Sequence, residues 1–275
     1  GRIKHASKAV EILVELDYVK AKEFSDAIEE NNKTRKELDK AITIEALEMI
    51  NTKKKSTVVF SKNWHKGVVG IVASRLIEHH YKPTIVLSEN DGILTGSARS
   101  VHDFDLYAAI SKCAHLCEKF GGHKYAAGLS IKKENIQTFI DAFENEVSNS
   151  ITADQLIPKV EFDIKIELTD VNEKLFRIIK QFAPFGPKNL SPVFLSSEVI
   201  DSGYSKRIGS DKSHLKIMAK TSRGSIQGIG FGMGDYFEII KHPNLFNICY
   251  SVSENEWNGR KNLQLMLKDI KKSEN

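Results

Sequence analysis

Hydrophobic positions in the first fifty residues recur at helical spacing. Apolar residues share one face over residues 9–16, and a second stripe with the same steps of three and four runs over residues 38–49. Between the stripes, the run EENNKTRKELDK alternates charges in the way expected of a solvated face, and three lysines at 53–55 end the section. We predict a helical linker over residues 1–50.

Over the next hundred residues, short β-branched runs alternate with helical stripes. Strands are expected over TVVF, TIVLS and GILTGSARS, and a glycine-punctuated helix, GVVGIVASRLI, is expected after the first of them. The stripe in DLYAAISKCAHLCEKF predicts a helix that ends at Gly121 and Gly122, and a further helix follows AAGLSI. Mixed strands and helices of this length predict one α/β domain over residues 51–150.

From residue 151 onward the period of the pattern changes to two. Apolar and charged residues alternate from Val160 to Leu168, which predicts a half-buried strand, and one helix is expected from Asp170 to Phe182. Five alternating runs separated by turn residues follow: VFLSSEVI, SHLKIMAKT, SIQGIGFG, FNICYSVSENEW and LQLMLKDI. These strands predict an all-β oligonucleotide-binding (OB) barrel over residues 151–275, so we expect a multidomain chain.

The composition is that of a globular chain with more than one domain. The 275 residues are 41% hydrophobic and 28% charged, which suits two or three domains. No run of eighteen apolar residues occurs, and GRIKHASKAV has neither a signal-peptide core nor an initiator Met, so we expect a cytoplasmic fragment of a longer protein. Three cysteines make no disulfide framework and are expected to be reduced thiols.

Positive charge is concentrated in the last third of the chain. The formal net charge is only +4, yet residues 203–272 hold twelve Lys or Arg against six Asp or Glu. A clustered positive surface attracts polyanions and suits a nucleic acid. Lysine-rich solvated faces are also common, so the charge alone leaves both interpretations open.

The stretch FGGHKYAAGL is the first candidate for a binding site. We place Gly121 and Gly122 in a turn between a helix and a strand, where glycine exposes backbone N–H groups that suit a phosphate. His123 beside them adds a hydrogen bond or, when protonated, a positive charge. The alternative is a helix end followed by a tight strand start, for which glycine is the usual stop signal.

The stretch GSARS is the second candidate. Ser97 and Arg99 are two residues apart on an expected strand, so a hydroxyl and a guanidinium point to one face and together suit a phosphate. The alternative is an arginine paired with a carboxylate on a polar sheet face. Trp64 and His65, before the GVVGIVASRL helix, are candidates for the edge of the same pocket, with a packed core position as the alternative for Trp64.

Metal and nucleophile signatures are weak. Cys113, His115 and Cys117 lie close together in sequence, but steps of two on a helix direct His115 away from the two sulfurs, and no second pair completes four ligands. We therefore predict no metal site in this chain and treat Cys113 and Cys117 as small apolar residues. The sequence contains no P-loop, nucleophile elbow or dinucleotide-binding fingerprint.

Several of these stretches occur together in one known family. NWHKGVVGIVASRLIEHHYKPTIVLS, GILTGSARS and FGGHKYAAGLSI resemble the DHH-associated domain of the DHH phosphoesterase superfamily. FAPFGPKNLSPVF, SHLKI, IGFGMG and NLQLMLKDIK are similar to the OB domain that follows it in the RecJ exonuclease family. GRIKHASKAVEIL resembles the junction that leaves the catalytic domain of that family. Lys66 departs from the family pattern, which often has proline there.

The resemblance implies a role in DNA metabolism. It implies a bacterial 5′ to 3′ exonuclease that degrades single-stranded DNA with two Mn²⁺ or Mg²⁺ ions in recombination and repair. The metals would be held by a DHH domain expected before Gly1, so this fragment would bind none and would not hydrolyse DNA by itself. Carried over position by position, one group of residues would line the cleft and hold the nucleotide or its 5′-phosphate: Ser97, Arg99, Ser100, Gly121, Gly122 and His123.

The expected barrel would thread single-stranded DNA by phosphate charge and base stacking. Charge and turn position select its candidate contacts: Tyr204, Lys206, Arg207, Lys216, Arg260 and Lys261. The expected partners are single-stranded DNA and, as candidates, a single-strand-binding protein or a helicase; we expect a monomer and no membrane. Two alternatives stay open: a stand-alone single-strand-binding module, disfavoured by GGH and GSARS, and a small-nucleotide phosphoesterase of the superfamily, disfavoured by the barrel.

Overall fold

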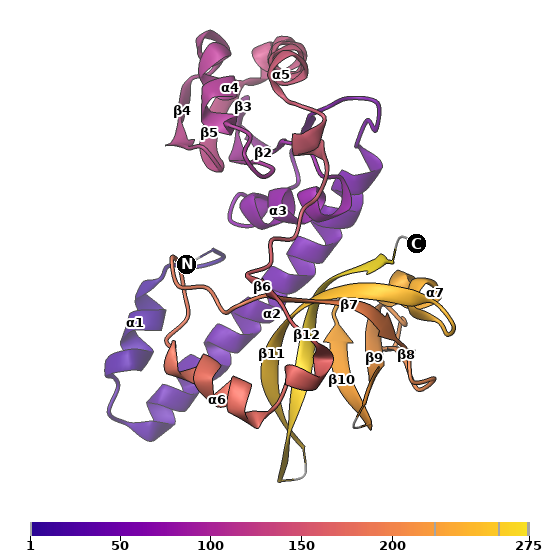
Figure 1. The fold of residues 1–275 in the computed structure, drawn as a ribbon. Coiled ribbons are helices and arrows are strands. Elements are labelled where there is room, and N and C mark those ends of the chain that lie inside the picture. The colour runs from indigo at the N-terminus through magenta and orange to yellow at the C-terminus, as the bar shows by residue number, and fades with distance from the viewer. Residues whose placement is uncertain (1, 223, 258, 274–275) are drawn as a thin grey trace. The chain divides into compact units, whose positions relative to one another are not determined.

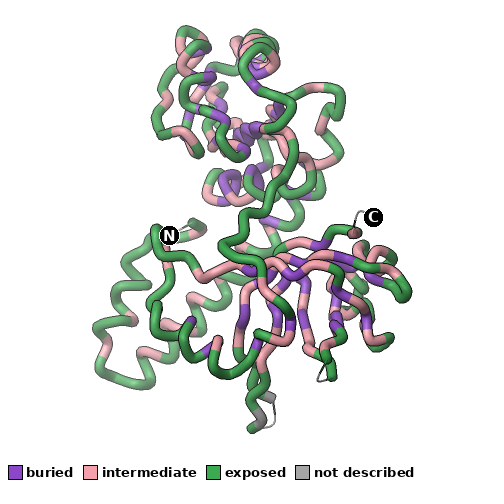
Figure 2. Tube along the Cα trace, in the orientation of Figure 1, coloured by how far each residue is buried: buried purple, intermediate pink, exposed green. Residues whose placement is uncertain are grey.

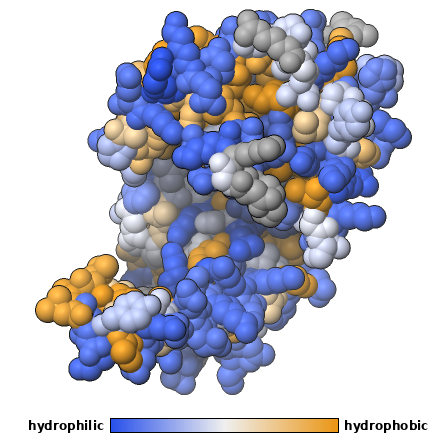
Figure 3. All heavy atoms as spheres, turned by 90° about the horizontal axis from the view of Figure 1, so that it is seen from below, coloured by the Kyte–Doolittle hydropathy of each residue, from blue (hydrophilic) through white to orange (hydrophobic). Residues whose placement is uncertain are grey.

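The protein is described by a computed structural model that covers residues 2–222, 224–257 and 259–273, without the side chains of Trp257 and Arg260 (Figure 1). It consists of two compact units, Gly1–Pro158 and Lys159–Asn275. Among the described residues, no helix combines the length and the apolar character needed to cross a membrane. The face seen in Figure 3 is mostly hydrophilic, and its hydrophobic residues gather in a few places.

The first unit begins with the two predicted helices, α1 (Ser7–Val14) and α2 (Tyr18–Glu48). Asp17 separates them because its carboxylate accepts hydrogen bonds from Val19 N and Lys20 N and so caps α2. No residue of α1 is buried, which Figure 2 shows as a largely exposed segment. The C-terminal part of α2 packs on the rest of the unit through Ile42 and Ala46.

The α/β fold predicted for this unit is confirmed. A five-stranded sheet has the order β1-β2-β3-β5-β4, in which β1 and β2 are parallel and the other pairs antiparallel. Its strands are β1 (Thr57–Ser61), β2 (Thr84–Asn90), β3 (Ile93–Arg99), β4 (Lys119–His123) and β5 (Ala126–Lys132). Its helices are α3 (Val69–His79), α4 (Leu106–Lys112) and α5 (Ile136–Ser150), with 3-10 turns η1 (Ala114–Leu116), η2 (Lys133–Asn135) and η3 (Asp154–Leu156).

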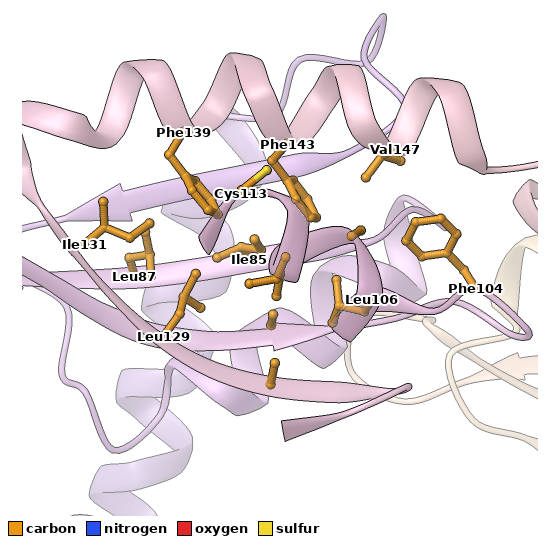
Figure 4. Packing of buried hydrophobic residues seen from close by; sticks show 14 of the residues in the cluster. Ile85, Leu87, Phe104, Leu106, Cys113, Leu129, Ile131, Phe139, Phe143 and Val147 are labelled. Atoms are coloured by element: carbon orange, nitrogen blue, oxygen red, sulfur yellow. The ribbon is translucent and has the colours of Figure 1, made fainter. Parts of the chain in front are cut away.

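Helices α4 and α5 cover one face of the sheet. Phe139, Phe143 and Val147 project from α5 onto sheet residues that include Ile85 and Leu129 (Figure 4). These three residues are fully buried because they recur on one stripe of α5, as the spacing predicted. The other face is only partly covered: α3 packs over β2 and β3, and a second apolar cluster holds it there.

The predicted helix over DLYAAISKCAHLCEKF is wrong in its second half. Helix α4 ends at Lys112, η1 follows, and β4 pairs with β5 through a two-residue hairpin formed by Lys124 and Tyr125. Gly121 and Gly122 therefore lie in an edge strand instead of a turn after a helix. The apolar spacing was ambiguous because the strand residue Phe120 packs against the same core as α4. Tandem glycines disfavour a helix, and β5 offers a partner.

The predicted OB barrel is confirmed in the second unit. The sheet order is β6-β7-β11-β12-β10-β9-β8, and the barrel closes where the bridge Asp201↔Ala219 joins the end of β7 to β9. The strands are β6 (Ile164–Lys165), β7 (Phe194–Ile200), β8 (Lys206–Ile208), β9 (His214–Thr221), β10 (Gly224–Gly230), β11 (Leu245–Trp257) and β12 (Arg260–Lys272). The helical elements are α6 (Glu173–Gln181), α7 (Phe237–Ile240), η4 (Leu168–Asp170) and η5 (Gly234–Tyr236).

The barrel interior is largely apolar and contains a buried pair of hydroxyl groups. Phe176 and Ile179 of α6 pack against the barrel core, and Asn172 caps this helix by accepting from Leu175 N. Tyr250 is fully buried, and its hydroxyl lies 2.9 Å from Ser196 Oγ. Burial raises the pKa of Tyr250 to about 12, so this hydroxyl stays neutral in the core.

The strand predicted between Val160 and Leu168 is wrong. Only β6 forms, as a two-residue edge strand parallel to β7. Val160, Phe162 and Ile164 are 39%, 47% and 54% exposed, whereas Leu168 is buried in η4. Alternation indicated a strand, but a segment at the sheet edge pairs on one side only, so its pattern did not guarantee burial.

Candidate nucleic-acid interface

Ser97 and Arg99 form a fixed pair on β3, as their spacing predicted. Arg99 Nη1 donates to Ser97 Oγ at 2.6 Å and to the carbonyl of Ala98 at 2.8 Å. Among the residues that the structure describes, no carboxylate lies within ion-pairing distance of Arg99. Burial and the neighbouring Arg2 both lower the pKa of Arg99. A half-buried guanidinium next to a second cation favours an anionic ligand.

The beginning of α3 borders the same pair. A methyl group placed on Gly70 would lie 3.1 Å from Arg99 Nη2 and 3.3 Å from Ser97 Oγ. A methyl group on Gly67 would overlap the backbone carbonyl of Arg2. Glycine at both positions therefore permits Arg2, α3 and Arg99 to converge. Sequence reasoning missed Arg2 and the two glycines, because neither the spacing nor the motifs linked the first residues of the chain to α3.

The exposed half of the sheet continues from Arg99 toward β4. In the antiparallel register, Ala126 of β5 lies between Arg99 of β3 and His123 of β4 and is paired with both. Gly128 of β5 likewise lies between Ser97 of β3 and Gly121 of β4 and is paired with both. Directly opposed residues point to one face, so the three strands present Arg99, Ser97 and His123 together. Two strand spacings separate the backbones of Arg99 and His123 by about 10 Å. We name this surface the β3–β5–β4 face.

The glycines of this region fall into two groups. A methyl group on Gly122 would overlap the carbonyl of Ala126 and lie 2.6 Å from Ala127 Cα, and its φ is +152°, so the fold itself requires glycine there. A methyl group on Gly121 would meet nothing within 4 Å, and one on Gly128 only the carbonyl of Gly96 at 3.8 Å. These two positions leave open a hollow of about 370 Å³ beside β4. Nothing in the described chain requires Gly121 to lack a side chain.

The remaining residues of the two motifs fix the loops at the end of the face. Ser100 Oγ donates to the carbonyl of Phe104 at 2.7 Å, and Ser100 N donates to the carbonyl of Tyr125. His123 is exposed, and its Nδ1 accepts a 3.4 Å hydrogen bond from Tyr125 N. Ser100 thus holds the chain beside the hairpin, and the imidazole of His123 remains at the surface.

The two pocket-edge candidates lie in different environments. Trp64 is 3% exposed, packs with α2 and α3, and donates from Nε1 to Glu45 Oε2 at 2.8 Å. Its ring is therefore not accessible to a ligand, in accord with the alternative of a core position. His65 is half-buried, and its Nδ1 accepts a hydrogen bond from Gly67 N at 3.0 Å.

In the barrel, two of the candidate lysines lie opposite each other. Lys206 of β8 and Lys216 of β9 are paired in the antiparallel register. Neither lysine has an ion-pair partner among the described side chains. Like charges directly opposite destabilise a sheet, so a bound anion would stabilise this pair. Tyr204 is 78% exposed and lies just before β8.

The other barrel candidates already have partners or lie outside the described residues. Arg207 donates from Nε to the carbonyl of Gly234, lies 3.7 Å from Glu238 and stacks over Phe237. Lys261 lies 3.2 Å from Glu254 and 3.8 Å from Glu256. The side chain of Arg260 is not among those that the structure describes. Lys206 and Lys216 are thus the candidates whose charge is least neutralised.

The cysteines are unlike reactive thiols. Burial and the neighbouring Cys113 raise the pKa of Cys117 to about 11. Burial likewise raises the pKa values of Cys113 and Cys249. Within the described residues, no three His, Cys, Asp or Glu side chains gather into a group that could hold a metal ion. The described part of the chain therefore offers anion-binding groups and no metal ligand set.

Two family models match the chain. The model described as the DHHA1 domain matches residues 29–149, and the one described as the RecJ OB domain matches residues 162–269. The chain thus combines a DHH-associated domain with an OB domain. It is therefore similar to the region of RecJ proteins that contains these two domains.

Relatives match the chain over its whole length. "Single-stranded-DNA-specific exonuclease RecJ" of Bacillus subtilis is 34% identical over 100% of the chain and 35% of its own length, and that of Escherichia coli is 26% identical over 98% and 48%. The crystal structure of RecJ in complex with Mn²⁺ from Thermus thermophilus matches with a TM-score of 0.82 at 24% identity, covering 100% of the chain and 40% of that structure. The chain spans about a third to a half of these relatives.

Proposed function

We propose that this chain is the substrate-binding region of a 5′ to 3′ single-stranded-DNA exonuclease that acts in recombination and repair. The β3–β5–β4 face holds the 5′-phosphate or terminal nucleotide, and the barrel holds the following single strand. Six residues are proposed for the first role: Ser97, Arg99, Ser100, Gly121, Gly122 and His123. The accessible barrel candidates Tyr204, Lys206 and Lys216 contribute to the second role.

One observation carries the proposal: the half-buried guanidinium of Arg99 is fixed by Ser97 and Ala98, has no carboxylate partner in the described structure, and has a pKa that burial and the charge of Arg2 both lower. A buried cation without an anion is costly, so the site gains most when a dianionic group binds. A terminal 5′-phosphate has more charge than an internal phosphodiester and is reachable from one side. The open hollow at Gly121 lets a nucleotide approach the neighbouring strand.

The proposal leaves bond cleavage to other segments. The described residues form no metal ligand set, so no hydrolytic step is assigned to them. Two related crystal structures are of RecJ in complex with Mn²⁺ and with Mg²⁺. We assign the use of either metal to the full-length enzyme, through the part of the relatives that this chain does not match. The same proposal includes domain boundaries at residues 50 and 150, a cytoplasmic location, a monomer, and a single-strand-binding protein or helicase as partner.

The test is a fluorescence-anisotropy titration with three DNA ligands at two salt concentrations. The ligands are a 5′-phosphorylated single strand, the same strand with a 5′-hydroxyl, and a blunt duplex. Charge-assisted hydrogen bonds contribute about 1.5–3 kcal/mol, so the phosphorylated strand should bind about tenfold tighter than the hydroxyl strand. Arg99→Ala should remove this preference and leave the hydroxyl strand's affinity unchanged.

The control is Arg177→Ala, which removes an exposed arginine of α6 remote from β3 in sequence. It should keep the full preference for the 5′-phosphate. Equal affinities of the unmodified chain for the phosphorylated and hydroxyl strands would contradict the pocket. Equal affinities for single strands and the duplex would contradict the role of the barrel.

A further inference from the structure

The β3–β5–β4 face continues beyond Ser97 into another row of polar side chains. In the antiparallel register, Ser130 of β5 is paired on one side with Thr95 of β3 and on the other with Lys119 of β4. Directly opposed residues share a face, and each member of this row is two residues from a member of the row that contains Ser97. We name Thr95, Ser130 and Lys119 the distal row.

The distal row lines the hollow beside β4. This hollow has a volume of about 370 Å³, and its lining includes the three residues of the distal row together with Gly121 and Gly128. Along β4 and β5, these two glycines lie between the distal row and the row that contains Arg99 and His123. The floor of the hollow is therefore bare backbone, with polar side chains beyond it in both strand directions.

The fold does not use the polar groups of the distal row. Among the described residues, the hydroxyls of Thr95 and Ser130 make no hydrogen bond and Lys119 makes no ion pair. The other lysines of residues 112–133 all contact carboxylates: Lys112 contacts Glu146, Lys124 contacts Asp103, Lys132 contacts Glu118, and Lys133 contacts Glu89. In this segment, Lys119 is therefore the lysine whose charge stays available to a ligand.

The separation between Ser97 and the distal row suits a single nucleotide. Arg99 is turned toward Ser97, because its Nη1 donates to Ser97 Oγ at 2.6 Å. A phosphate held by this pair lies beside Ser97, and Thr95 is two residues, or about 7 Å, further along β3. One nucleotide spans such a separation between its phosphate and the hydrogen-bonding edge of its base. Its sugar then lies over the bare backbone of the glycines.

We propose that the distal row binds the hydrogen-bonding edge of the base in the 5′-terminal nucleotide. The ammonium group of Lys119 only donates, whereas the hydroxyls of Thr95 and Ser130 both donate and accept. This set of groups matches guanine, whose O6 and N7 are adjacent acceptors, better than adenine, which has an amino donor at N6. The site therefore favours a 5′-terminal guanine over an adenine. The inference rests on the proposed function and extends it from the terminal phosphate to the terminal base.

The test is fluorescence anisotropy on the full chain with 5′-phosphorylated single strands labelled at the 3′ end. The strands are identical except at the first nucleotide, which carries guanine, adenine or no base. Contacts with the barrel are then the same for all three ligands, so any difference in affinity reports on the terminal base. The guanine strand should bind about tenfold tighter than the abasic strand and about threefold tighter than the adenine strand.

Variants of the distal row should act on the guanine complex. Lys119→Ala should remove the advantage of guanine and change the affinity for the abasic strand by less than about twofold. The double variant Thr95→Val with Ser130→Ala removes both hydroxyls with little change of shape and should reduce the same preference. The matched control is Lys132→Ala, which removes a lysine of β5 that already contacts Glu118 and should keep the full preference.

Two outcomes would overturn the inference. One is equal affinity of the unmodified chain for the guanine and abasic strands, as expected if Lys119 only prevents strand pairing at the sheet edge. The other is an equal loss for all three strands in Lys119→Ala, because the lysine would then act through its charge alone. A 5′-hydroxyl guanine strand tests the proposed function separately: if it binds as tightly as the phosphorylated one, the phosphate site itself is wrong.

Discussion

The β3–β5–β4 face and the outer face of the barrel both present cations without carboxylate partners, but they hold them differently. Arg99 is half-buried, and Ser97 and Ala98 fix its guanidinium in one orientation. Lys206 and Lys216 lie opposite each other on two strands, and no described side chain bonds their ammonium groups. The first site is therefore preorganised for one group, and the second is adaptable.

This difference determines what each surface can recognise. A half-buried guanidinium with a fixed orientation binds a phosphate at one defined place, and salt screens the energy of this interaction only weakly. Hydrated lysines bind phosphates anywhere along a strand, and salt screens them strongly. We therefore expect the first unit to define the strand end and the second unit to hold its length.

The largest expected effect compares a glycine that the packing of β3 requires with a glycine of β4 that the fold leaves free to carry a side chain. A methyl group on Gly96 would overlap the carbonyl of Val86 in the neighbouring strand, whereas one on Gly121 meets nothing. Gly96→Ala should therefore lower the free energy of unfolding by about 3 kcal/mol or more, measured by urea denaturation. Gly121→Ala is the matched control and should change it by less than about 1 kcal/mol. Equal losses in the two variants would contradict this distinction between the two glycine positions.

The next effect concerns the stability of the first unit at acidic pH. Burial alone would raise the pKa of Glu144, but hydrogen bonds from Ser56 and Lys55 outweigh it and lower the pKa. A lowered folded pKa means that this stabilisation is present above the ordinary value of about 4.3 and is lost as pH falls through the folded pKa. Glu144→Gln should cost about 1–2 kcal/mol at pH 7.

The matched control for that prediction lies on the same helix. Glu146 contacts Lys112 in an exposed ion pair, so Glu146→Gln should cost less than about 1 kcal/mol. Urea denaturation at pH 7 and pH 3 would measure both variants against the unmodified chain. The penalty of Glu144→Gln should shrink at pH 3, and a penalty that grows there would contradict the assigned direction.

A substitution that preserves the charge tests whether the planar guanidinium of Arg99 differs in effect from the ammonium group of a lysine. Arg99→Lys keeps the positive charge but cannot bond Ser97 and a phosphate with the same planar geometry. We expect it to lose most of the roughly tenfold preference for a 5′-phosphate in the anisotropy titration. If Arg99→Lys retains the full preference, charge alone explains the site, and the first unit does not differ in kind from the barrel.

The sequence predicted the fold class well because its patterns were long or repeated. Only a helix buries the apolar stripe of α5 on one face, and only strands bury the apolar residues of the alternating barrel runs on one face. Both structures formed as expected. The residues after α4 did not, since Leu116, Cys117 and Phe120 pack against the same core from a 3-10 turn and a strand. Apolar spacing could not distinguish these structures over so short a segment.

The candidate site was predictable only where its residues lie close together in sequence. Ser97 and Arg99 share a strand, so their common face followed from the period of two. Arg2 and Gly67 are sixty-five positions apart, and their approach depends on how α2 and α3 pack.

The smallest expected effect tests the two opposed lysines on the outer face of the barrel. Lys206→Ala and Lys216→Ala should each weaken single-strand binding about threefold and reduce the salt dependence of log K by about 0.7. Lys261→Ala should do less, because Glu254 and Glu256 already neutralise that lysine. Titrations at four salt concentrations would measure the slopes. If removing Lys261 flattens the slope as much as removing Lys216, the charge is spread evenly over the barrel, and the opposed lysines have no special role.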